Sequence, residues 1–157
     1  MNNVNRSFRD VNGKDLFFVV LYAIVLSILM GIALGLLDSV IQTQISFSLS
    51  FIFFFFSSRY LGRTIRKLYD VPHLLYVIIA FVGLFIQASI ILVLHLHASV
   101  YNIIEHPEIF LNELVYIDTI KSLLKATFTG GIFQFLNYTI TYLLYGVGIY
   151  IGLRETY

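Results

Sequence analysis

Three histidines and one glutamate near residue 100 are the side chains whose types and spacing are best suited to chemistry. His95, His97, Glu105 and His106 offer imidazole and carboxylate groups, which are common ligands of zinc and copper. His95 and His97 are two positions apart in a predicted helix, so their side chains point roughly 200° apart. We therefore expect interfacial side chains, no bound metal and no cofactor, and keep a metal-dependent intramembrane enzyme as an alternative.

The rest of the sequence offers no catalytic pattern. It contains no cysteine, which excludes disulfides, thiolate metal sites and cysteine nucleophiles. It also lacks a nucleophile elbow, a phosphate-binding glycine loop, a dinucleotide-binding glycine pattern and a zinc-protease motif. We therefore expect a protein that is not an enzyme.

Neutral polar side chains within apolar segments form a second group of interest. They are Gln44, Ser48, Gln87, Gln134 and Asn137. No Asp, Glu, Lys or Arg lies near the middle of these segments, although such charges usually mark proton relays and ion paths. Two interpretations stay open. The amides join helices by hydrogen bonds, Gln87 to a serine of the second helix or to Asn137, or they line the path of a small oligomeric transporter or channel.

The composition indicates which solvent surrounds the elements that carry these residues. Of the 157 residues, 59% are hydrophobic and 12% are charged, and the mean hydropathy is +0.86. Soluble domains are about half apolar and about a quarter charged, so this chain requires a lipid environment. The net charge of +1, without a basic stripe, gives no reason to expect nucleic acid as a partner.

Four apolar stretches are long enough to cross the roughly 30 Å hydrocarbon core of a bilayer at about 1.5 Å per residue. The sequence predicts helices over residues 16–37, 40–58, 74–96 and 128–153. A tight turn is predicted at Asp38 and Ser39 between the first two. The expected fold is all-α, a single transmembrane domain over residues 1–157 built as an integral membrane four-helix bundle.

A fifth helix is predicted over residues 107–125, in the long connection before the last crossing. Pro107 and Glu108 suit the first turn of a helix. Its apolar side is interrupted by Glu113 and Lys121. The helix is expected either to lie flat at the membrane surface or to cover the outer end of the bundle.

Basic residues predict the orientation of the chain. Arg59, Arg63, Arg66 and Lys67 cluster between the second and third predicted helices, and further basic residues lie near both chain ends. Because Lys and Arg are retained on the cytoplasmic side, both termini are predicted to be cytoplasmic, in a cell or inner membrane. The cluster also suits anionic lipid headgroups.

Small residues recur at intervals of four in two predicted helices. They are Ser27, Gly31, Gly35 and Ser39 in the first helix and Gly148 and Gly152 in the fourth. Such a strip lets a second helix backbone approach closely. We expect the strip in the first helix to pack against the second or fourth helix of the chain, or against a partner.

Short matches indicate a possible internal repeat. Asp10-Val11 and Asp70-Val71 precede the first and third predicted helices, and YLGR at 60–63 and YIGLR at 150–154 end the second and fourth. Matches this short also arise from composition alone. Duplication of a helical hairpin is therefore a hypothesis.

The leading hypothesis for function combines the small-residue strips with the lack of catalytic groups. It is a multi-pass, non-enzymatic accessory, assembly or regulatory subunit that acts through helix–helix contacts. Its expected partners are the lipid bilayer and a second membrane protein or another copy of the chain. The transporter or channel and the metal-dependent enzyme are the alternatives.

Overall fold

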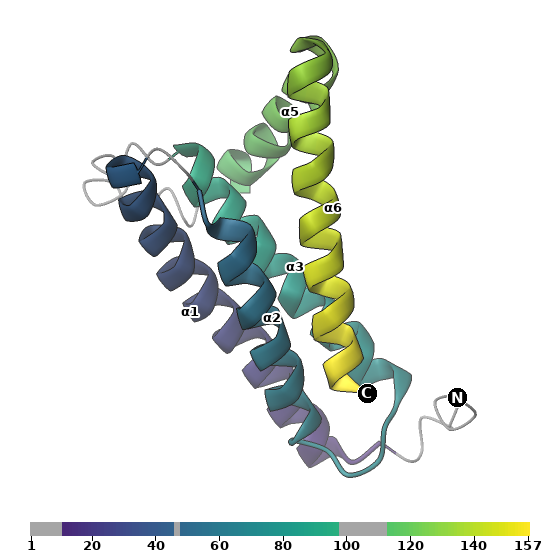
Figure 1. The fold of residues 1–157 in the computed structure, drawn as a ribbon. Helices are drawn as coiled ribbons and strands as arrows, with labels where there is room; N and C mark the ends of the chain where they lie inside the picture. The colour runs from purple at the N-terminus through teal and green to yellow at the C-terminus, as the bar shows by residue number, and fades with distance from the viewer. Residues whose placement is uncertain (1–10, 46–47, 98–112) are drawn as a thin grey trace.

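The computed structural model of the chain describes residues 11–45, 48–97 and 113–157. The described residues form five α-helices and no strand. These helices are α1 (Gly13–Ile45), α2 (Ser50–Arg66), α3 (Leu74–His97), α5 (Glu113–Thr129) and α6 (Gly131–Thr156) (Figure 1). The prediction of an all-helical protein is confirmed for this part of the chain.

Three of these helices are long and apolar enough to cross a membrane. The candidate spans are Gly13–Gln42 in α1, Leu74–Leu94 in α3 and Gly131–Thr156 in α6. α2 is shorter, with 17 residues, and arginines occupy its second half. The described helices indicate a membrane protein, whereas a fourth crossing by α2 stays a prediction.

The predicted turn at Asp38 and Ser39 is wrong, because both residues lie within α1. α1 continues to Ile45, and the next helix begins at Ser50 rather than at residue 40. The prediction rested on the rule that a charged residue ends an apolar span. Asp38 is fully buried instead, and its carboxylate accepts hydrogen bonds from residues that lead into α2, which offsets the cost of burying it.

The later helices differ less from the prediction. α3 ends one residue beyond the predicted boundary, and α6 is shifted by three residues toward the C-terminus. α5 also begins and ends later than the predicted 107–125, of which residues 107–112 lie outside the described residues. Gly131, with φ of +78°, makes the sharp turn between α5 and α6, a backbone conformation that favours glycine.

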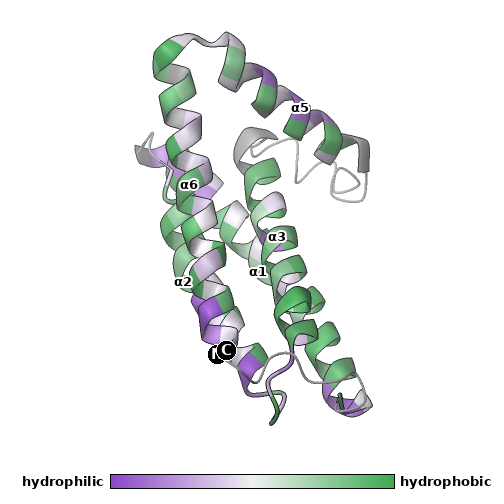
Figure 2. Ribbon diagram, turned by 90° about the vertical axis from the view of Figure 1, so that its right-hand side faces the viewer, coloured by the Kyte–Doolittle hydropathy of each residue, from purple (hydrophilic) through white to green (hydrophobic). Residues whose placement is uncertain are grey.

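The helices pack as two pairs. α1 packs mainly against α3, and α2 mainly against α6. Figure 2 shows α2 and α6 on one side, α1 and α3 on the other, and α5 inclined between the far ends of α6 and α3. Since α5 contacts both α6 and α3, it covers one end of the bundle, which is one of the two placements expected for this helix.

The two ends of the bundle differ in packing. At the end that holds the α2–α3 connection and the C-terminus, called the closed end below, α1, α2 and α3 share one buried core. Its members are Val19, Ala23, Leu61, Ile65, Tyr69, Tyr76, Ala80 and Leu84. At the other end, called the open end, α3 and α6 separate and α5 lies between them (Figure 1).

Both ends of the described chain lie at the closed end. Val11 and Leu16, around the start of α1, pack on the same core as Leu153, near the end of α6. The side of a membrane on which the closed end lies stays a prediction.

Candidate functional site

The strip of small residues in α1 lies against α3, a neighbour that the sequence analysis did not name. Ser27 is fully buried. A Cβ atom on Gly31 would lie 3.0 Å from the Cβ of Ile90, and one on Gly35 would lie 2.9 Å from the Cβ of Leu94. Ser39 continues the strip, and its hydroxyl donates to the carbonyl oxygen of Gly35 at 3.0 Å.

A second close contact joins α2 and α6. A Cβ atom on Gly62 would overlap the carbonyl oxygen of Gly152. One turn earlier in α6, a Cβ on Gly148 would lie 2.7 Å from the ring of Phe54. The spacing of small residues predicted close packing at Gly148 and Gly152 but not at Gly62, whose only signal was its place in the YLGR match.

The close contacts fall on positions that the proposed repeat makes equivalent. Gly62 and Gly152 each follow a matched tyrosine by two residues. Ala23 and Gly83 each lie thirteen residues after a matched aspartate. A Cβ on Gly83 would lie 2.7 Å from the carbonyl oxygen of Ala23, so in both helix pairs a residue meets its own counterpart. This adds a spatial argument to the duplication hypothesis.

The intramembrane polar residues are not gathered in one place. Gln87 is fully buried, and its Nε2 donates to the hydroxyl of Ser57 in α2 at 2.6 Å. Gly31 of α1 lies beside Gln87. Gln44 is exposed and follows Gly31 by 13 residues, so it lies about 20 Å farther along the helix. Gln134 and Asn137 lie in α6, but their side chains are outside the described residues.

Asp38 holds the junction of α1 and α2. Its Oδ1 accepts a hydrogen bond from the backbone N–H of Leu49 at 2.6 Å, and its Oδ2 accepts one from the hydroxyl of Ser48 at 2.8 Å. Ser48 also lies 2.9 Å from the hydroxyl of Ser50, the first residue of α2. Backbone N–H groups at a helix start favour a negative charge. Sequence analysis missed this role, although Asp38 is the lone acid between residues 16 and 58.

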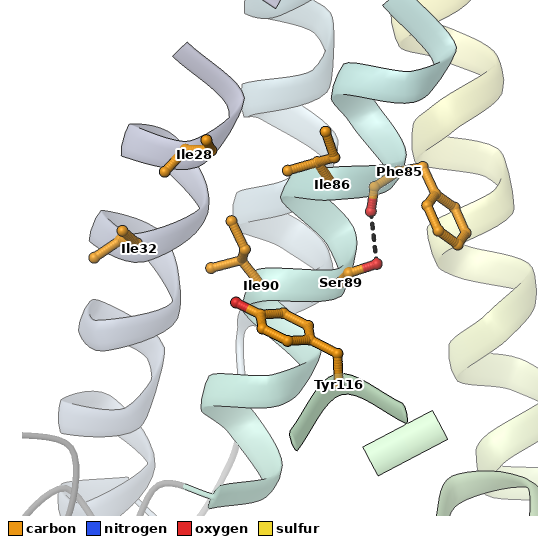
Figure 3. Close-up of a pocket in the computed structure, with 7 residues that line it drawn as sticks. All are labelled: Ile28, Ile32, Phe85, Ile86, Ser89, Ile90 and Tyr116. Atoms are coloured by element: carbon orange, nitrogen blue, oxygen red, sulfur yellow. Dashed lines mark hydrogen bonds between the residues drawn. The ribbon is translucent and has the colours of Figure 1, made fainter. Parts of the chain in front are cut away.

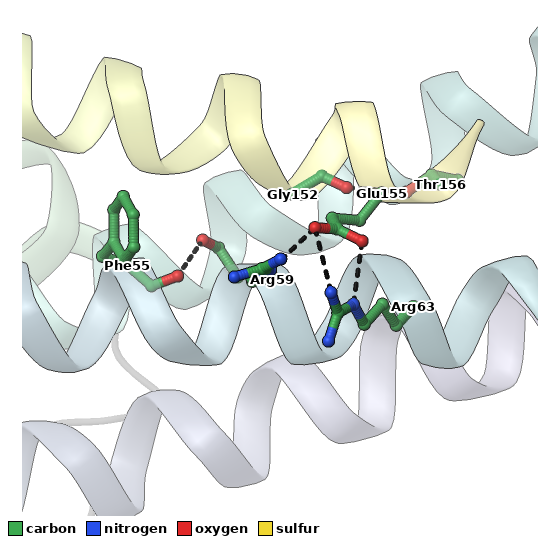
Figure 4. Close-up of polar contacts among 7 residues, drawn as sticks. Phe55, Arg59, Arg63, Gly152, Glu155 and Thr156 are labelled. Carbon is green, nitrogen blue, oxygen red and sulfur yellow. Dashed lines mark hydrogen bonds and ion pairs between the residues drawn. The ribbon is translucent and has the colours of Figure 1, made fainter.

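The basic cluster is tied to the end of α6. Figure 4 shows Glu155 between Arg59 and Arg63, whose Nε atoms lie 2.7 and 2.8 Å from its carboxylate oxygens. Arg66 donates to the carbonyl oxygens of Tyr157 and Tyr69. Lys67 is exposed. Three of the four basic residues selected from the sequence thus hold the C-terminal residues, and about half of each Arg59 and Arg63 side chain stays accessible.

Tyr69 closes the same end of the molecule. Its hydroxyl donates to the carbonyl oxygen of Thr156, and its ring stacks on Tyr76 with a centroid separation of 4.3 Å. Burial raises the pKa of Tyr69 to about 12, and the nearby Arg66 guanidinium opposes this shift. The tyrosine therefore stays neutral over the physiological range.

No side chain of the four candidate metal ligands is among those that the structure describes. His95 and His97 end α3, but their side chains are not described, and neither are Glu105 and His106. Among the described residues no group of three or more potential ligands could hold a metal ion. The expectation that no metal is bound stays a prediction.

Two apolar cavities lie beside α3 near the open end. One, of about 390 Å³, is lined by Ile28 and Ile32 of α1, by α3 and by Tyr116 of α5. Figure 3 shows the Tyr116 ring beside Ile90 and Ser89, with the α1 isoleucines opposite. The other, of about 490 Å³, lies between α3, α5 and α6 and shares Phe85, Ser89 and Tyr116 with the first.

The described geometry offers packed helix contacts, one capping carboxylate and apolar cavities. Comparison of the chain with models of known protein families, with curated proteins and with solved structures finds no match.

Proposed function

We propose that this chain is a four-pass membrane protein with both termini in the cytoplasm, and that it serves as a non-enzymatic accessory, assembly or regulatory subunit. The observation that carries the proposal is the hairpin of α5 and α6 at the open end. Three large apolar side chains around its turn are mostly exposed: Phe128 is 76% exposed, Ile132 70% and Phe133 85%. We call these three residues the hairpin tip.

The internal contacts of the chain support a role for the hairpin tip. Gly31, Gly35, Gly148 and Gly152 are already occupied by side chains and backbone of the same chain. A partner would therefore meet large apolar side chains rather than a strip of small residues. Between helices in lipid, association depends on close packing more than on the hydrophobic effect, so a partner surface complementary to these rings is required.

A non-enzymatic role agrees with the use of the buried polar groups. Asp38 caps the junction of α1 and α2, and Gln87 joins α3 to Ser57 of α2. Each of these groups has a packing role within the chain. The partner is either another membrane protein or a second copy.

Photo-crosslinking tests the proposed contact. A photoreactive phenylalanine analogue at Phe133 is expected to capture one defined membrane protein, or a second copy, after purification in mild detergent. The matched control carries the analogue at Phe17, which is 62% exposed near the start of α1, and is expected to capture only lipid. Monomeric protein that gives no protein adduct at Phe133 would overturn the proposal.

Thiol labelling tests the four crossings, and the lack of native cysteine makes it direct. Single cysteines at Thr64 and Asn102 are expected to react with a membrane-impermeant reagent from opposite sides. Cysteines placed next to Arg9 and after Arg154 should react from the same side as Thr64. Labelling of the two chain ends from opposite sides would contradict the proposed topology.

A further inference from the structure

The larger cavity at the open end is a groove between α3, α5 and α6. Phe85 and Leu92 of α3 form one wall, Ile120 and Leu124 of α5 cover it, and Tyr142 and Gly146 of α6 form the other wall. Its volume is about 490 Å³, and it is only partly enclosed. None of the three hairpin-tip residues lines it, so the groove and the proposed partner surface are separate.

Gly146 faces open space in this groove. A Cβ atom built on Gly146 would meet nothing within 4 Å, whereas Gly148 and Gly152 in the same helix are covered by Phe54 and by Leu84 and Ser58. α6 therefore faces open space at Gly146 but is closely packed at Gly148 and Gly152.

The walls of the groove decide which chemical class fits it. Most of the lining surface is hydrocarbon, and the hydroxyl groups come from Ser89, Tyr116, Thr119, Tyr142 and Tyr145. Tyr142 already lies 3.2 Å from the hydroxyl of Thr127, and Thr119 donates to the carbonyl oxygen of Val115. A buried water needs two to four polar partners, which most of this surface does not offer. The occupant must be apolar.

The volume distinguishes a hydrocarbon chain from a helix. A helix with side chains is a cylinder about 10 Å wide and takes roughly 400 Å³ per turn, so the groove would hold little more than one turn. A methylene group takes about the volume of a water molecule, roughly 30 Å³, so the groove holds on the order of 15 methylenes. This is the size of one lipid chain.

We propose that this groove binds one acyl chain of a membrane phospholipid. The groove is only partly enclosed, and two of its three helices, α3 and α6, are long and apolar enough to cross a bilayer, so a lipid chain in the membrane lies within reach of it. The bound lipid fills the space that separates α3 from α6 below α5. It is held more tightly than lipids that merely surround the helices.

Native mass spectrometry of the wild type and of a variant whose groove is filled by a side chain tests this inference. Wild-type protein, washed extensively in detergent and given phosphatidylcholine, is expected to retain one phospholipid per chain. Gly146→Phe places a ring where there is open space and is expected to lower retention by about tenfold or more. Leu143→Phe adds a ring to the exposed side of α6 and is expected to retain lipid like the wild type.

A fluorescent reporter keeps the test independent of the stability of the Gly146 variant. The chain has no tryptophan, so Phe85→Trp gives a single tryptophan, whose emission reports on the groove. Phospholipid brominated on its chains should quench it at mole fractions too low to quench Leu143→Trp. Equal retention by wild type and Gly146→Phe, no retained lipid, or a dimer that Gly146→Phe dissociates would each overturn the proposal. Failure here leaves crosslinking at Phe133 unaffected, since the two sites differ.

Discussion

The closed and open ends of the bundle share α3 and α6 but are packed differently. At the closed end, Gly62 and Gly152 bring the backbones of α2 and α6 together, and Glu155 binds Arg59 and Arg63. At the open end, Gly146 of α6 faces a groove, and α5 lies between the separated ends of α3 and α6. Two glycines six residues apart in α6 therefore have opposite effects.

The role of a glycine in a helix depends on what faces it. Where a backbone faces it, as at Gly62, the glycine allows a close contact that no larger residue permits. Where open space faces it, as at Gly146, the missing side chain leaves room for a ligand. Substitutions at these positions separate the two roles.

The largest expected loss of stability comes from a substitution at the closed end. Gly62→Leu places a side chain on the carbonyl oxygen of Gly152, a backbone atom that can move only with its helix. We expect a loss of about 3 kcal/mol in the free energy of unfolding. Gly146→Leu is the matched control and should change stability by less than about 1 kcal/mol, because it also gains helix propensity. Circular dichroism during denaturant titration in detergent micelles measures both, and similar losses would refute the contrast.

The next effect concerns the junction of α1 and α2 at Asp38. Asp38→Ala leaves the N–H of Leu49 and the hydroxyl of Ser48 without this acceptor, so we expect a loss of about 2 kcal/mol. Asp38→Asn keeps one acceptor oxygen and should lose less. The same unfolding assay measures both variants. An Ala variant as stable as the wild type would show that the carboxylate does not hold this junction.

The closed end should also weaken at high pH through Tyr69. The folded protein raises the pKa of Tyr69 to about 12 from an ordinary value of 10.0, so the folded state favours the neutral phenol. The contribution of Tyr69 to the free energy of unfolding is fully present below pH 10 and is lost as the pH rises toward 12. The loss near pH 12 is about 2 kcal/mol, since one pKa unit corresponds to about 1.4 kcal/mol.

Tyr69→Phe separates this titration from that of other groups. The variant lacks the ionisable hydroxyl, so the difference between the two unfolding curves should shrink between pH 10 and pH 12. A difference that stays constant over this range would contradict the assignment.

A smaller effect is expected midway between the two ends. Ser57→Ala removes the hydroxyl that accepts from Gln87, and interhelical hydrogen bonds in membranes contribute about 1 kcal/mol. Ser58→Ala is the control, because the Ser58 hydroxyl donates to the carbonyl oxygen of Phe55 in its own helix. Both variants are compared by unfolding in detergent. Equal losses of stability in the two variants would mean that the hydrogen bond between α2 and α3 adds nothing to the free energy of unfolding.

The smallest effect is expected at the ion pairs of the closed end. Glu155→Gln removes a charge that two half-exposed arginines share, and exposed ion pairs contribute little. We expect a slight fall in the unfolding temperature at low salt that disappears near 1 M salt, where charges are screened within about 3 Å. A fall that persists at high salt would indicate a packing role for Glu155.

The sequence predicted more of the elements than of their contacts. Uninterrupted apolar runs predicted both boundaries of α3 closely. They predicted at least one boundary of α1 and of α6 within a few residues, because a long apolar run has few alternatives to a helix. The boundary at Asp38 failed, since the rule that charges end a span ignores a carboxylate that binds the next helix. α2 therefore began ten residues later than predicted.

Candidate sites were predictable in type but not in partner. Small residues at spacing four indicated close packing, yet the partner of the α1 strip was α3, which lies next to it only after the intervening chain has turned twice. The groove gave no signal at all, because Gly146 has the same sequence context as a packing glycine. Its openness depends on helices far away in sequence.

By itself the sequence determined the apolar, helical character of the chain, since hydrophobicity and its runs are properties of single residues. Only the tertiary structure decided that α1 meets α3, that Glu155 binds two arginines, and that Gly152 is covered while Gly146 is open. The physical reason is that each of these contacts joins residues from separate helices. The distances between these residues depend on the angles at which the helices cross, and no local sequence pattern specifies those angles.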